Sequence, residues 1–109
     1  MNDNKLVSNA LRQIYLQFKQ TDYDDPNLLS KMHSFREQIR EIEANHSLSP
    51  DQKKVLQMEM SYVDDHITLL GISQEIKESS NPSKKQILQL KYTIDDIDFC
   101  LQNLSALDI

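Results

Sequence analysis

The chain has 109 residues, of which 39% are hydrophobic and 27% charged, as is typical of one folded domain over residues 1–109 rather than of a disordered chain. Its single glycine argues against an all-β fold, which needs frequent turn residues, and against the glycine-rich loops that bind phosphates. The net charge is −5 and no Lys or Arg follows Lys91, so we expect no direct binding to nucleic acid.

The first half of the chain predicts two helices, each with one apolar face. Over residues 4–20, apolar side chains recur every three or four positions, which places them on one side of a helix. A polar stretch then breaks the pattern, and Asp25 can cap a second helix over 26–45 whose first residue is Pro26. The apolar residues of the first helix are Val7, Leu11, Ile14 and Phe18. Those of the second are Leu28, Met32, Phe35, Ile39 and Ile42.

The second half predicts two longer helices, each preceded by a helix-start signal. Ser49 and Gln52 have the spacing of a capping box, with a proline between them at the first helical position, so we expect a helix over 50–79. Asn81 followed by proline predicts a fourth helix over 82–106. Four helices joined by short loops predict an all-α, antiparallel up-down four-helix bundle.

Gly71 lies inside the third predicted helix. A glycine in a helix costs about 1 kcal/mol relative to alanine. A continuous helix over 50–79 would also be about 40 Å long, longer than either of the first two helices. The sequence leaves two alternatives open, in which the ends of the helix protrude from the bundle or Gly71 breaks it.

The helix over 50–79 carries two apolar stripes instead of one, so we expect it to contact two neighbours at once. A polar line of Glu59, His66 and Ser73 separates the stripes. These three residue types could form a catalytic relay, but positions seven apart lie about 10 Å apart along a helix, too far for proton transfer. We interpret the line as a polar seam. One stripe consists of Leu56, Met60, Val63, Ile67 and Leu70, and the other of Met58, Tyr62, Leu69, Ile72 and Ile76.

The helix over 82–106 also has two apolar sides. Its main seam is Ile87, Leu90, Ile94, Ile97, Leu101 and Leu104. A narrower stripe of Leu88, Tyr92 and Phe99 lies opposite, with Asp95 and Asp96 between its members. Either the first helix or the chain termini cover this second stripe, or it is a surface for a partner or a second copy.

Motifs for chemistry are incomplete. Only Glu43 and His46 have the Glu-x-x-His spacing of di-iron bundles, which need two such pairs. The acidic run at 22–25 lacks the glycine and the glutamate that complete a calcium loop. We therefore expect no metal site, no cofactor and no enzymatic activity.

The sequence also predicts where the protein is located. It has no run of about 18 apolar residues that could span a membrane. Its N-terminus is polar and lacks the apolar core of a signal peptide. Cys100 is a lone cysteine in an apolar helical pattern, where it behaves as a small hydrophobic residue. We expect a cytoplasmic protein without an intrachain disulfide.

These features predict a protein-binding module that acts as a small adaptor, a chaperone or a stoichiometric inhibitor. Its partner is expected to be another protein with a basic surface. The architecture is similar to that of class IIa bacteriocin immunity proteins and of secretion or flagellar chaperones, so the alternative is a cytoplasmic immunity protein that acts on a membrane receptor complex. A bundle that binds a metal or a small molecule is a third alternative, and homodimerisation through the same faces is compatible with each. The predicted partner-binding residues are Leu88, Tyr92, Asp95, Asp96, Asp98, Phe99, Ile72 and Ile76.

Overall fold

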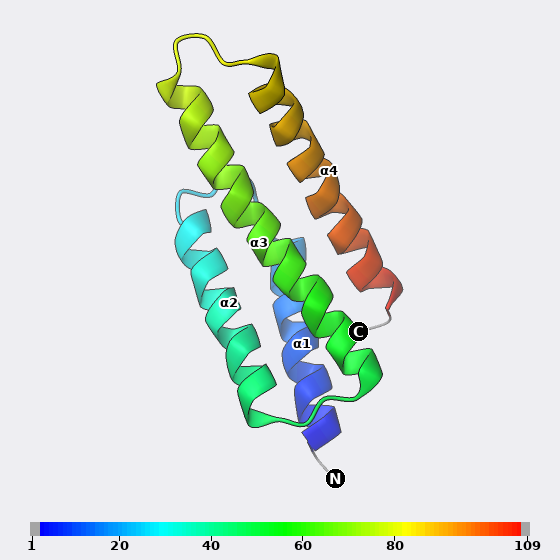
Figure 1. The fold of residues 1–109 in the computed structure, drawn as a ribbon. Helices are drawn as coiled ribbons and strands as arrows, with labels where there is room; N and C mark the ends of the chain where they lie inside the picture. Colours follow the sequence, from blue (N-terminus) through cyan, green and yellow to red (C-terminus); the bar gives the residue numbers. More distant parts are fainter. Residues whose placement is uncertain (1–2, 108–109) are drawn as a thin grey trace.

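The computed structural model describes residues 3–107, which form four helices joined by loops. Residues 1, 2, 108 and 109 of the predicted domain lie outside the described part. The helices are α1 (Asp3–Lys19), α2 (Leu28–Asn45), α3 (Pro50–Glu78) and α4 (Lys84–Ala106). Successive helices run in opposite directions and pack side by side (Figure 1). The predicted all-α, antiparallel up-down bundle is therefore confirmed.

The starts of α3 and α4 are set by capping boxes in which both hydrogen bonds are formed. At α3 the prediction is confirmed, because the Ser49 hydroxyl accepts from Gln52 N–H and the Gln52 side chain accepts from Ser49 N–H. α4 begins two residues later than predicted, since Ser83 and Gln86 form the same reciprocal pair. A full capping box satisfies two backbone N–H groups, which the cap-plus-proline signal at Asn81 does not do.

α2 also begins two residues later than predicted, at Leu28. Asp25 does not cap it: its carboxylate accepts from Asn27 N–H and pairs with Lys31. These contacts hold the pKa of Asp25 below its ordinary value, with the Lys31 hydrogen bond as the main cause. The acidic run before α2 thus forms a hydrogen-bonded turn, and the first residues after it are not yet helical.

α3 continues through Gly71 without a break. Gly71 is exposed, and a Cβ atom added there would meet no described atom within 4 Å. The alternative with protruding ends is confirmed, since α3 and α4 extend past α1 and α2 at one end of the bundle (Figure 1). The molecule is elongated, with extents of 57 × 24 × 22 Å.

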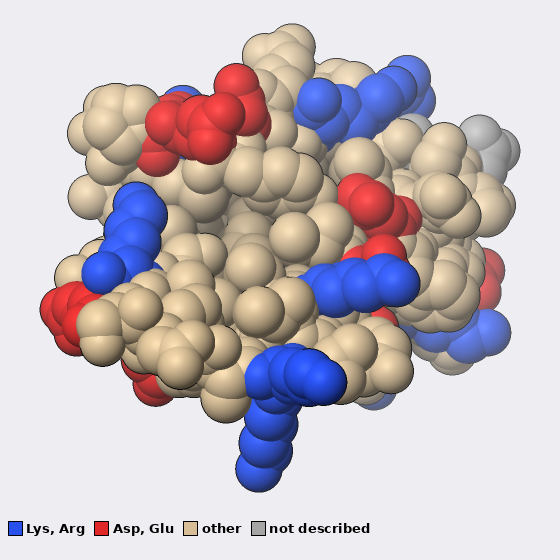
Figure 2. Space-filling view, turned by 90° about the horizontal axis from the view of Figure 1, so that it is seen from above, with Lys and Arg blue, Asp and Glu red and all other residues tan. Residues whose placement is uncertain are grey.

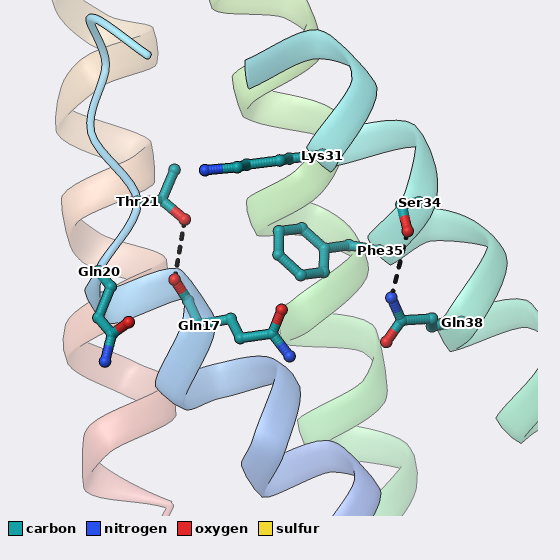
Figure 3. A pocket seen from close by; sticks show the side chains of 7 residues that line it. All are labelled: Gln17, Gln20, Thr21, Lys31, Ser34, Phe35 and Gln38. Atoms are coloured by element: carbon teal, nitrogen blue, oxygen red, sulfur yellow. Dashed lines mark hydrogen bonds between the residues drawn. The ribbon is translucent and has the colours of Figure 1, made fainter. Parts of the chain in front are cut away.

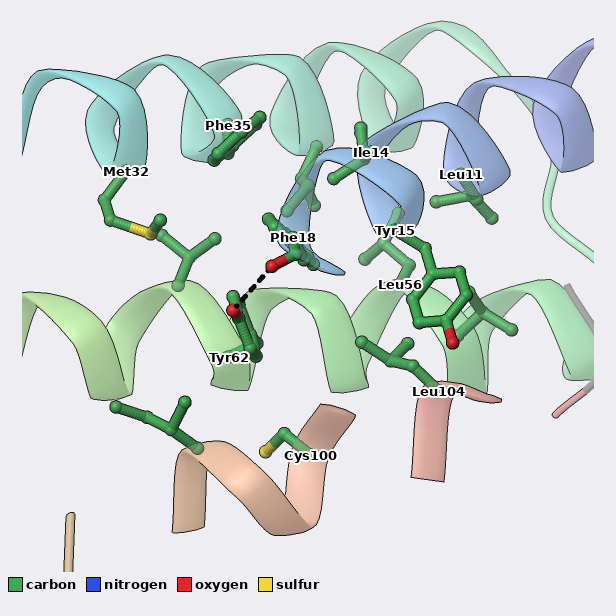
Figure 4. Packing of buried hydrophobic residues seen from close by; sticks show 14 of the residues in the cluster. Leu11, Ile14, Tyr15, Phe18, Met32, Phe35, Leu56, Tyr62, Cys100 and Leu104 are labelled. Carbon is green, nitrogen blue, oxygen red and sulfur yellow. Dashed lines mark hydrogen bonds between the residues drawn. The ribbon is translucent and has the colours of Figure 1, made fainter. Parts of the chain in front are cut away.

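The core lies along the middle of the bundle and contains side chains of all four helices (Figure 4). All the apolar residues predicted to face inward from α1 and α2 are buried. Phe18 is central: its ring stacks on Tyr62 at 4.3 Å between centroids and meets Phe35 edge-on at 4.9 Å. The Tyr62 hydroxyl donates to the Phe18 carbonyl oxygen at 3.2 Å, so this buried hydroxyl has a partner.

α3 contacts the other three helices, which explains why it needs apolar side chains on two sides. α4 packs chiefly on α3 and touches α1, and no contact joins the described parts of α2 and α4. Along α4, Ile97 and Leu104 are buried as predicted. Ile87 was assigned to the same seam but is 52% exposed, because the end of α4 that carries it lies beyond α1 and α2.

Candidate functional site on the outer face of α4

The side of α4 that points away from the bundle carries large apolar side chains. Leu88, Tyr92 and Phe99 are 49%, 62% and 60% exposed. Their spacings of four and seven residues place them on one side of the helix, opposite the buried Ile97 and Leu104. We call these three residues and the charged side chains beside them the outer face of α4. The charged side chains are Lys84, Lys85, Lys91, Asp95, Asp96 and Asp98. Neither α1 nor any other part of residues 3–107 covers this face, which is exposed in the described part of the chain.

Charged side chains border this apolar stripe. Asp95 and Asp96 are exposed, and Asp96 and Lys85 line an open hollow of about 800 Å³ together with Leu88 and Tyr92. Lys85 was not among the predicted residues, although its spacing from Leu88 and Tyr92 places it on the same side of the helix. The lining thus combines two large apolar side chains and the polar Gln89 and Thr93 with one charge of each sign.

Asp98 is held by the fold as well as exposed. Its carboxylate accepts a hydrogen bond of 3.1 Å from the hydroxyl of Tyr23, in the loop between α1 and α2. Burial and this contact raise the pKa of Tyr23 to about 12. Asp98 therefore links the α1–α2 loop to α4, and it lies at the edge of the outer face.

Ile72 and Ile76 of α3 were also predicted to bind a partner, but Ile72 is buried, unlike the predicted residues of α4. It is only 5% exposed, and Ile76 is half-buried. Ile72 follows Asp65 by seven residues and so lies on the same side of α3, where the Cys100 thiol of α4 donates to Asp65 at 3.8 Å. The prediction that Ile72 is available to a partner is wrong, because α4 covers that side of α3.

Comparison of the chain with protein-family models, with curated proteins and with solved structures found no match. Function therefore has to follow from the surfaces and side chains of this molecule. Three further features compete with the outer face of α4: the buried polar line of α3, a hollow between α1 and α2, and the lone cysteine.

The predicted polar seam of α3 is buried at the centre of the bundle. Glu59 and His66 are both fully buried, and Ser73 is half-buried. Within residues 3–107, neither Glu59 oxygen and neither His66 nitrogen has a hydrogen-bond partner. His66 contacts the rings of Tyr62 and Tyr23, at 4.6 and 5.5 Å between centroids. Since the side chains of the line make no hydrogen bonds to one another, they form no proton relay.

Burial makes both groups neutral near pH 7. Desolvation raises the pKa of Glu59 to about 9, and lowers the pKa of His66 to about 4 against a smaller opposing effect of Asp98. The sequence predicted the position of this seam from the helical spacing. It could not predict that the partners would be missing, because partners come from neighbouring helices.

A hollow of about 250 Å³ lies between the end of α1 and the start of α2 (Figure 3). Its polar groups are used locally: Thr21 donates to the Gln17 carbonyl, Gln38 donates to Ser34, and Lys31 pairs with Asp25. This hollow therefore offers a ligand few unpaired polar groups. Cys100 is buried as predicted, and its pKa is raised to about 11 by burial and by Asp65, so its thiolate form is disfavoured.

The described residues carry no metal cluster, no membrane-spanning helix and, in the end-on view, no single large basic patch (Figure 2). In the described part of the chain, no group of three or more His, Cys, Asp and Glu side chains is placed to hold a metal ion. None of the four helices is long and apolar enough to cross a membrane. Seen from the end of the bundle, Lys and Arg side chains lie in small separate groups between acidic and uncharged residues (Figure 2).

Proposed function

We propose that this protein acts by binding another protein without catalysing a reaction, and that the outer face of α4 is its binding surface. One observation carries the proposal: Leu88, Tyr92 and Phe99 are exposed on a helix whose opposite side fills the core. Grouped apolar side chains on a surface indicate a binding site. Their exposure to water is unfavourable, and burial against a partner would stabilise the complex.

The side chains of the face suit different parts of such a contact. Tyr92 and Phe99 are large and ordered by the helix, and aromatic residues often contribute most of the energy of protein interfaces. Asp95 and Asp96 would orient a basic partner and speed its approach. This arrangement suits an adaptor, a chaperone or a stoichiometric inhibitor, each of which acts by occupying a surface of its target.

The test is a pull-down from the native host with three tagged forms: wild type, Tyr92→Asp with Phe99→Asp, and Leu29→Asp. Leu29 on α2 is 48% exposed, close to the 49% of Leu88, so it controls for adding a charge at an exposed apolar site away from the face. We expect a partner that wild type and Leu29→Asp retain and the double variant loses. Circular dichroism checks that all three are helical.

Two results would contradict the proposal. A folded double variant that keeps every partner would place binding elsewhere. A double variant that unfolds would make Tyr92 and Phe99 part of the core. If the lost partner is a membrane transporter, the immunity-protein alternative replaces the soluble adaptor or chaperone while the binding surface stays the same.

A further inference from the structure

Charge is ordered by sign along the outer face of α4. Three exposed lysines come first along the helix and three exposed aspartates follow. Leu88 lies among the lysines, and Tyr92 lies between the lysines and the aspartates. The lysines are Lys84, Lys85 and Lys91, and the aspartates are Asp95, Asp96 and Asp98. One face thus carries a basic half and an acidic half.

A second copy of the same helix, turned end for end, has the complementary order. If two α4 helices pack antiparallel about a two-fold axis near Tyr92, the basic half of each copy meets the acidic half of the other. Tyr92 of one copy then lies beside Tyr92 of the other. Packing in the parallel direction would bring lysine onto lysine and aspartate onto aspartate, which is unfavourable.

The two flanks of the helix also match. At about 100° per residue, Lys85 and Asp96 lie on one flank, and both line the hollow beside Tyr92. Lys84, Lys91, Asp95 and Asp98 lie on the other flank. A two-fold axis across antiparallel helices brings like flanks together, so Lys85 faces Asp96 on one flank and Lys84 faces Asp98 on the other. Lys91 lies close to the axis, beside both Asp95 and Lys91 of the second copy. The contact is self-complementary, as an isologous interface requires.

From this charge order we propose that the outer face of α4 binds a second copy of the chain, in an antiparallel α4–α4 dimer. The inference rests on the proposed function, because it uses the same face and names the partner. The fold leaves room for it: α4 meets α3 and α1 on its inner side, and its outer side carries no other described helix.

The test exchanges charges without touching the apolar residues. One variant carries Lys84→Asp and Lys85→Asp, and the other carries Asp95→Lys and Asp96→Lys. Asp98 is left in place because it holds Tyr23. All four side chains are exposed, so folding should persist, and circular dichroism checks this. Mass is measured by sedimentation equilibrium.

We expect a wild-type dimer whose dissociation constant rises by about tenfold or more between low and high salt, because the paired charges are screened. Each exchange variant alone should be monomeric, and an equal mixture of the two should form a heterodimer. Two outcomes would overturn the inference: a wild type that stays monomeric up to about 1 mM, a concentration at which even a weak complex forms, or a mixture without heterodimer.

The failures of the two proposals are distinguishable. A monomeric wild type that still loses a foreign partner on Tyr92→Asp with Phe99→Asp overturns the dimer and leaves the proposed function standing. A dimer that survives both these substitutions and the charge exchanges lies on another surface, and overturns the inference. A foreign partner that the folded double variant retains overturns the proposed function.

Discussion

Glu59 and His66 are unusual residues for the centre of a small bundle. Both are fully buried, and no hydrogen bond within the described chain reaches their side-chain polar atoms. A buried polar group without a partner costs about 1–3 kcal/mol. The protein tolerates this cost by keeping both side chains neutral, as the raised pKa of Glu59 and the lowered pKa of His66 indicate.

We predict that Glu59→Leu stabilises the protein. The substitution removes a carboxyl group that makes no hydrogen bond and keeps a side chain of similar size in the core, so the free energy of unfolding should rise by about 1–3 kcal/mol. Glu75→Leu, at an exposed position on the same helix, is the matched control and should change it by less than about 0.5 kcal/mol. Urea denaturation followed by circular dichroism measures both, and a destabilised Glu59→Leu would show that the carboxyl group has a stabilising partner.

The same two residues predict how stability depends on pH. Between pH 4.5 and about 9, folded Glu59 keeps a proton that the unfolded chain loses, so its contribution decreases as pH rises. Between about pH 4 and 6.5, the unfolded chain protonates His66 and the folded state does not, so stability decreases as pH falls. The two slopes oppose each other between pH 4.5 and 6.5, and Glu59 alone acts above that range.

Wild type should therefore lose stability between pH 7 and 9, by up to about 1.4 kcal/mol per pH unit. Glu59→Leu should lack this decline. Urea midpoints measured at pH 5.5, 7 and 8.5 check the prediction, and equal midpoints at pH 7 and 8.5 in the wild type would contradict it.

At the scale of single helices, Gly71 offers a direct test. It lies inside α3, it is exposed, and a methyl group added there meets no described atom within 4 Å. Gly71→Ala should therefore raise the free energy of unfolding by about 0.5–1 kcal/mol through helix propensity alone. Thermal unfolding measures this. An unchanged or lower melting temperature would contradict a regular helix at this position.

The apolar faces of the helices and their caps could be predicted from the sequence where they depend only on residues close together in the chain. The apolar faces of α1 and α2 and the Ser49–Gln52 capping box follow from neighbouring residues alone. The starts of α2 and α4 lie two residues after the predicted ones, because Pro26 lies in a turn and Pro82 in a loop instead of at the first helical position. Ser83 with Gln86 was visible in the sequence as a second capping box, and its two reciprocal hydrogen bonds decide the start of α4.

For the whole molecule, the unequal lengths of the helices decide which apolar residues are exposed. α3 and α4 extend past α1 and α2 (Figure 1). Ile87 is exposed there although it continues the inner seam, whereas Ile72 is covered because α4 lies over its side of α3. The second stripe of α4 could be predicted from spacing. Its exposure could not, because that depends on which helices pack against α4.

We propose that Tyr92 and Phe99 serve binding and not folding. The most direct measurement is the free energy of unfolding of Tyr92→Asp with Phe99→Asp, compared with wild type in dilute solution where any dimer is dissociated. Because both side chains are mostly exposed, we predict a difference of less than about 1 kcal/mol for the pair. A loss of about 3 kcal/mol or more, as for buried aromatic residues, would place these side chains in the core and contradict a binding role for them.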